Sequence, residues 1–286
     1  MLIFGDISRS EKAIKNTWCD LCESLKSREF LYYETEKAKL QTFLKVFNDL
    51  FYDNNGMQYL TINVHSIKNG LMRGTKLSAN EVLNYERFLP KKEFIKSSNR
   101  FSPAGVEWLY LALDTYIPAV DTIKQELRVQ TNERFGYCNF ELNKEFSNSK
   151  IVDLTIADDY TYEYLNCELN NALRRSADEK VKYILRGKKK NAKGQNLFGT
   201  KEKNMVIKWA VFTYCKLLSE QIFIPIKTND DELEYTPFHT IAQYFISLGY
   251  SGIIYKSTVS NGGKNLVLFD KTMAKPSGKI KEEIVQ

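Results

Sequence analysis

The first residues that could do chemistry stand in a turn that leads into a short apolar run. Residues 99–105 read NRFSPAG and residues 108–112 read WLYLA, so Arg100 is expected in a turn and Tyr110 in a buried strand. An arginine in a turn can hold a phosphate or a carboxylate with two parallel hydrogen bonds. The alternative is an arginine that only fixes its own loop, and this segment alone leaves both interpretations open.

A second pair of polar residues stands near the C-terminus. Residues 252–257 (GIIYKS) and 262–269 (GGKNLVLF) form two apolar runs on either side of a glycine-containing turn. Ser257 and Asn265 are therefore expected at strand ends, where a side chain can face a cleft. Each could instead be a hydrogen-bonded turn residue.

Several common kinds of active site are excluded by the residues present. The two histidines, His65 and His239, are far apart and lack partners at metal-binding spacing, and the usual metalloprotease, P-loop, Rossmann and serine-hydrolase motifs are missing. Cys19 and Cys22 form a single CxxC pair, whereas a structural zinc ion needs four ligands. We predict no metal site and interpret this pair as part of a packed helical face, with all five cysteines as free thiols.

The elements that must position these residues are of mixed type. Ser8 and Glu11 have capping-box spacing, and two amphipathic helices are expected before the turn at residues 53–56. After that turn, strands are expected at 59–64, 108–113, 136–140, 151–156, 252–257 and 265–269, and helices at 119–128, 160–185, 205–220 and 237–248. The absence of a regular strand–helix alternation favours an α+β fold. We predict a helical N-terminal extension at 1–56, a main domain at 57–270 and a loose polar tail at 271–286.

The charge distribution argues against a broad nucleic-acid surface. The chain has 41 basic and 35 acidic residues, and seven of the basic residues with one acid fall between residues 186 and 203. The remaining 34 basic and 34 acidic residues balance, so the body is neutral and carries one basic loop. No apolar run approaches the length that crosses a bilayer, and no export signal is present, so a cytoplasmic location without a membrane partner is expected.

Taken together, three segments resemble the RES-domain family, which is named for its Arg, Glu and Ser. Residues 99–112 resemble the family's arginine-and-tyrosine segment, residues 122–128 (TIKQELR) its glutamate segment, and residues 252–269 its serine segment. The resemblance covers roughly residues 57–270, and the first 56 residues are similar to a helical extension of some longer members. His239 stands where a glutamine is more usual.

This resemblance implies a fold related to ADP-ribosyltransferases and an enzyme that consumes NAD as its substrate. Residue by residue, Arg100, Tyr110, Glu126 and Ser257 become the catalytic set. Arg100 would hold the pyrophosphate, Tyr110 would meet the nicotinamide–ribose end, and Ser257 with Asn265 would orient the ribose or the amide. The family usually places its glutamate about eleven residues after its tyrosine, which here is Asp121. Glu126 fits better by its flanking residues, and Asp121 is the alternative.

The implied function is that of a toxin that cleaves the nicotinamide–ribose bond by phosphorolysis or hydrolysis, with a helix-turn-helix antitoxin as a partner. The greater length of this chain than that of the compact toxins weighs against the antitoxin pairing. Three alternatives remain: ADP-ribose transfer to a protein or nucleic acid from the same site, an interaction module that binds nucleic acid through the loop at 186–203, and an inactive fold. The sequence does not choose between water, phosphate and a macromolecule as acceptor.

Overall fold

A mixed sheet of eight strands forms the body of the computed structural model, which describes residues 6–285 except 79, 186–198 and 226–230. The strands are β1 (Thr61–Asn63), β2 (Leu71–Leu77), β3 (Leu109–Leu113), β4 (Arg134–Leu142), β5 (Lys150–Asp153), β6 (Gly252–Lys256), β7 (Lys264–Leu268) and β8 (Ala274–Ile284). Their order is β1-β5-β6-β7-β3-β2-β4-β8, and only the β5–β6 pair is parallel among the described strands.

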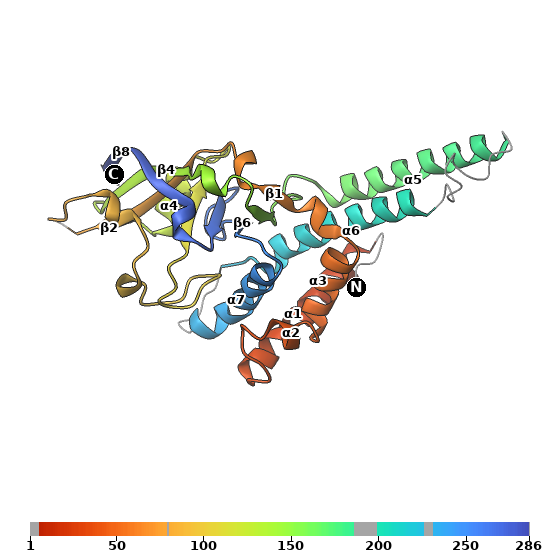
Figure 1. Ribbon diagram of the computed structural model, residues 1–286, viewed down its shortest axis with the longest axis horizontal. Coiled ribbons are helices and arrows are strands. Elements are labelled where there is room, and N and C mark those ends of the chain that lie inside the picture. The colour runs from red at the N-terminus through yellow and green to blue at the C-terminus, as the bar shows by residue number, and fades with distance from the viewer. Residues whose placement is uncertain (1–5, 79, 186–198, 226–230, 286) are drawn as a thin grey trace.

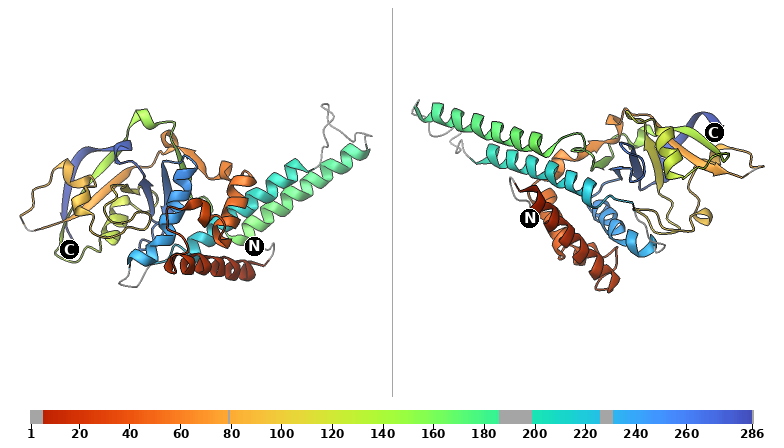
Figure 2. Two further views of the ribbon diagram at one scale, coloured as in Figure 1. Left: turned by 60° about the horizontal axis from the view of Figure 1, so that its bottom comes forward. Right: turned by 180° about the vertical axis from the view of Figure 1, so that it is seen from behind.

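Helices flank this sheet and precede it along the chain (Figure 1), which confirms the predicted α+β class. They are α1 (Ile7–Lys26), α2 (Thr35–Ala38), α3 (Thr42–Asn48), α4 (Ala119–Glu126), α5 (Tyr162–Leu185), α6 (Thr200–Gln221) and α7 (Asp231–Ser247). Figures 1 and 2 show α5 and α6 side by side, extending away from the sheet. Of the basic loop predicted at 186–203, residues 186–198 lie outside the described residues.

The N-terminal helices share a hydrophobic core with α6 and α7. Phe47, which is fully buried on α3, packs its ring 5.8 Å from Tyr214 of α6 and 5.7 Å from Phe245 of α7, measured between ring centroids. A π-helical turn (Asp49–Asp53) continues α3, and two residues later the chain turns at Asn55, whose φ of 60° lies in the left-handed region. The predicted turn at residues 53–56 is thus where the helical segment ends. The division into three domains stays a prediction.

Strand pairing brings the expected site segments together from distant parts of the chain. In the register of β3 with β7, Ala112 lies opposite Asn265, and in the register of β6 with β7, Tyr255 lies opposite Asn265. Helix α4 packs on β2 at Gly74, where an added Cβ would lie 2.3 Å from a methyl carbon of Ile123. Glycine is therefore required at this position for α4 to approach the sheet.

Two local predictions were wrong, and one strand was not predicted. Helix α1 is capped by Asp6, whose side chain accepts a hydrogen bond from the Arg9 amide, so Ser8 does not begin a capping box. Strand β2 was not predicted, because LMRGTKL contains a glycine and two basic residues and does not alternate between apolar and polar positions. The C-terminal segment is not a loose tail, since β8 pairs with β4 on both sides of an irregularity between Ser277 and Lys281.

Helix length and composition give no membrane-spanning candidate. Among the helices that the structure describes, none combines the length and the apolar character needed to cross a bilayer.

Candidate active site

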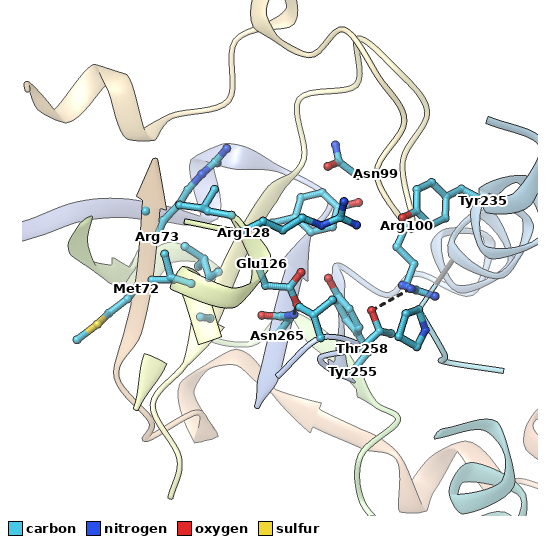
Figure 3. Close-up of a pocket in the computed structure, with 18 of the residues that line it drawn as sticks. Met72, Arg73, Asn99, Arg100, Glu126, Arg128, Tyr235, Tyr255, Thr258 and Asn265 are labelled. Atoms are coloured by element: carbon cyan, nitrogen blue, oxygen red, sulfur yellow. Dashed lines mark hydrogen bonds between the residues drawn. The ribbon is translucent and has the colours of Figure 1, made fainter. Parts of the chain in front are cut away.

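A cavity of about 470 Å³ opens where β2, β3, the end of α4 and the β6–β7 turn meet. Its polar and aromatic lining comes from segments far apart in the sequence and includes Tyr110 and these residues, labelled in Figure 3: Arg73, Asn99, Arg100, Glu126, Arg128, Tyr235, Tyr255, Thr258 and Asn265. Four of the five predicted site residues therefore line one cavity. The fifth, Ser257, is not part of the lining, but it donates a hydrogen bond to Glu126, which is.

Glu126 ends α4 and is accessible from the cavity, where two donors fix one of its oxygens. Its Oε1 accepts a hydrogen bond of 2.6 Å from the Ser257 hydroxyl and one of 2.8 Å from the Asn265 side-chain amide. The Ser257 oxygen itself accepts from the backbone N–H groups of Ser260 (3.0 Å) and Val259 (3.3 Å), so its single proton is directed at Glu126. Both bonds end on Oε1, which leaves Oε2 to face the cavity.

The turn that carries Ser257 rests directly on α4. The Ser257 amide donates to the Gly263 carbonyl at 2.8 Å, and the Ser260 hydroxyl lies 3.3 Å from that of Thr122 on α4. An added Cβ at Gly263 would lie 2.5 Å from the Thr122 hydroxyl oxygen, so only glycine permits this approach. The glycine in the predicted turn thus lets the turn pack closely on α4, so that Ser257 lies beside the helix that carries Glu126.

Arg100 reaches the cavity from a loop and is only 8% exposed. Its Nη2 donates to the Ile224 carbonyl at 3.2 Å and to the Thr258 hydroxyl at 3.1 Å, and its guanidinium carbon lies 4.8 Å from the centre of the Phe238 ring. Its Nη1 is buried without a hydrogen-bond partner among the described residues. Burial lowers the pKa of Arg100, but an arginine keeps its charge at neutral pH. One nitrogen therefore fixes the loop, and the other is a buried donor without a partner among the described residues.

The hydroxyl of Tyr110 forms hydrogen bonds within the loop that carries Arg100. The hydroxyl lies 2.9 Å from the Ser102 hydroxyl and accepts a hydrogen bond from the Phe101 amide at 3.3 Å. Burial raises the pKa of Tyr110 well above its usual value, so the hydroxyl stays protonated. Its ring lines the cavity while its hydroxyl holds the loop.

Sequence reasoning missed two further arginines of the cavity. Arg73 lies on β2, and its Nη1 is buried without a hydrogen-bond partner among the described residues, with burial lowering its pKa to about 10. Arg128 follows α4 with a φ of 50°, in the left-handed region. The only signal for Arg73 was an arginine beside Gly74 within a weakly apolar run. Three guanidinium groups and one carboxylate line the cavity, so its net charge favours an anionic ligand with more than one negative charge.

The two candidate acids lie in different places. Asp121 is in the first turn of α4 and lines a separate pocket with Lys124, Gln125 and Asn261. Glu126 lines the cavity together with Arg100. The geometry therefore favours Glu126 as the acid of this cavity.

The part of the chain that the structure describes contains no group of three or more His, Cys, Asp or Glu residues that could hold a metal ion. Cys19 is exposed and Cys22 is partly buried on α1, and both are free thiols. Burial raises the pKa of Cys22 to about 12.

Comparison with known proteins identifies the family of the C-terminal segment. A family model described as the RES domain matches residues 217–283. The chain thus contains a RES domain at these residues, which confirms the resemblance there. The match includes Ser257, Asn265 and His239, whereas Arg100, Tyr110 and Glu126 lie before it. No curated protein and no solved structure matched the chain.

Proposed function

We propose that this protein cleaves the bond between nicotinamide and ribose in NAD. The observation that carries the proposal is the carboxylate of Glu126, held on one oxygen by Ser257 and Asn265 in a cavity that it shares with three arginines. The RES domain at residues 217–283 supports NAD as the substrate, through the activity that the resemblance implies.

The charges of NAD fit those of the cavity. Its pyrophosphate carries two negative charges, and the buried Nη1 atoms of Arg73 and Arg100 are donors without partners among the described residues. A buried donor without a partner costs roughly 1–3 kcal/mol, which an anionic oxygen would recover. Arg73 and Arg100 would therefore bind the pyrophosphate, with Arg128 at the accessible side.

The chemistry needs one negative charge beside the ribose. As the glycosidic bond breaks, positive charge develops on the ribose, and nicotinamide leaves as a neutral molecule, so no general acid is required. The free Oε2 of Glu126 would stabilise that charge and accept a hydrogen bond from a ribose hydroxyl. Ser257 and Asn265 act through Glu126: by donating to Oε1 they fix the position of the carboxylate.

The test is incubation of the purified full chain with NAD, with and without phosphate, followed by chromatography. We expect nicotinamide release, together with ADP-ribose if water is the acceptor or its 1-phosphate if phosphate is. ADP-ribose found by mass spectrometry on added protein or nucleic acid would instead show the transferase alternative. NAD that remains intact under all these conditions would refute the proposal. A helix-turn-helix antitoxin as partner stays a prediction of the resemblance.

A further inference from the structure

Two neighbouring residues of α7 lie between the N-terminal helices and the Arg100 loop. Phe238 and His239 are both 3% exposed, and α7 contacts both α1 and α2. Figures 1 and 2 show the N-terminal helices lying along α7 on the side away from the cavity-forming loops. Each of the two residues touches the loop with one part and the extension with another.

On the loop side, the contacts fix both the backbone and the side chain. Nε2 of His239 lies 3.0 Å from the Asn99 carbonyl oxygen. Because a carbonyl only accepts, Nε2 carries the proton and donates. Phe238 lies under the guanidinium of Arg100, with 4.8 Å between the guanidinium carbon and the ring centre. The loop is closed by a 2.8 Å hydrogen bond from the Asn99 amide to the Ser102 carbonyl, so moving one end displaces Arg100.

On the other side, two aromatic residues of the extension pack against the same pair. The ring of Trp18 on α1 lies 5.0 Å from that of Phe238, and the ring of Tyr32, just after α1, lies 5.7 Å from that of His239 in an edge-to-face arrangement. Trp18 is itself held by Phe43 of α3, at 5.0 Å between ring centroids. The contacts therefore run without a gap from the helical extension to the cavity.

We propose that the helical extension positions the Arg100 loop through Phe238 and His239, so that Trp18 and Tyr32 are positioning residues for the cavity. The expected effect on KM rests on the proposed function, whereas the expected effect on the position of the Arg100 loop does not. A displaced loop would weaken the grip of Arg100 on the substrate and leave Glu126 in place, because Glu126 is held by Ser257 and Asn265. The loss would then appear in KM more than in kcat.

The test uses Tyr32→Ala, because Tyr32 is only partly buried and its truncation spares the core around Trp18. Amide hydrogen exchange of residues 98–104 is measured in the full chain, with the KM for NAD as the second readout. We expect exchange and KM to rise about threefold to tenfold, the size of one lost aromatic contact, with kcat within about twofold. The matched control is Tyr52→Ala, a 58% exposed tyrosine of the same extension, which should leave both readouts unchanged.

A second pair of variants separates the hydrogen bond from packing. His239→Gln keeps an N–H donor for the Asn99 carbonyl and should behave like wild type, whereas His239→Leu should raise loop exchange and KM. Unchanged exchange in Tyr32→Ala would overturn the proposal, and so would a His239→Gln variant as impaired as His239→Leu. If no form of the protein consumes NAD but Tyr32→Ala still loosens the loop, the proposed function fails and the positioning role stands.

Discussion

Replacing Glu126 by glutamine removes one negative charge from the cavity and replaces Oε2, the proposed acceptor for a ribose hydroxyl, by an amide nitrogen. The carboxamide oxygen of the new side chain can accept the same two hydrogen bonds from Ser257 and Asn265 that Oε1 accepts now. The side chain should therefore keep its place, with its amide nitrogen toward the cavity. Stability should change little, so that the loss reports on the charge and on the acceptor that Oε2 offers to the substrate.

The size of the loss follows from the electrostatics of an accessible carboxylate. A unit charge about 4 Å from the developing positive charge contributes about 4 kcal/mol at an effective dielectric constant near 20. Removal of one preorganised group commonly lowers kcat by a factor on the order of 10²–10³. We expect a fall in kcat of that order with a rise in KM of no more than about tenfold, because the lost hydrogen bond from the ribose hydroxyl contributes about 0.5–1.5 kcal/mol.

Steady-state nicotinamide release measures both constants, and thermal unfolding checks that the variant is folded. Asp121→Asn is the matched control, because Asp121 lies on the same helix but lines a different pocket. It should keep wild-type turnover. A Glu126→Gln variant with full activity beside an inactive Asp121→Asn variant would refute the assignment of the acid.

Two further predictions concern the arginine and the cysteines. Arg100→Ala should raise KM for NAD by roughly 10-fold to 100-fold with a smaller change in kcat, because a hydrogen bond to a charged group contributes about 1.5–3 kcal/mol; an unchanged KM would show that Arg100 only fixes its loop. Iodoacetamide at about pH 8 should label Cys19 well before Cys22, because Cys19 is exposed and burial raises the pKa of Cys22 to about 12; equal labelling by peptide mass mapping would contradict that difference.

Elements with a strong pattern could be predicted from the sequence, and elements with a weak pattern could not. Helix α6 and strands β3, β6 and β7 carry buried apolar runs, and each lies within a few residues of its predicted position. Strand β8 was missed because its composition is polar and contains Pro276 and Gly278, which are tolerated at a sheet edge. Its place in the sheet depends on pairing with β4, which a local pattern does not show.

Site residues could be predicted where they belong to a recognisable sequence motif. They could not be predicted where only the folding of the chain brings them to the cavity. Arg100, Glu126 and Asn265 came from recognisable segments, and the structure brings all three to one cavity. Arg73 came from the missed strand β2, so its position beside the site could not be seen. Tyr110 was expected to stack on or hydrogen-bond to the nicotinamide–ribose end. Its hydroxyl is engaged by Ser102 and the Phe101 amide, partners that sequence spacing does not reveal, while its ring lines the cavity.

The two borders of the sheet bear on how the molecule behaves in a crowded solution. One border is β1, only three residues long, which offers a neighbouring chain few backbone groups to pair with. The other is β8, where Pro276 removes a donor and the lysines and glutamates at 279–283 oppose close approach. Both borders therefore discourage strand-to-strand polymerisation, which favours a monomeric sheet even at high protein concentration.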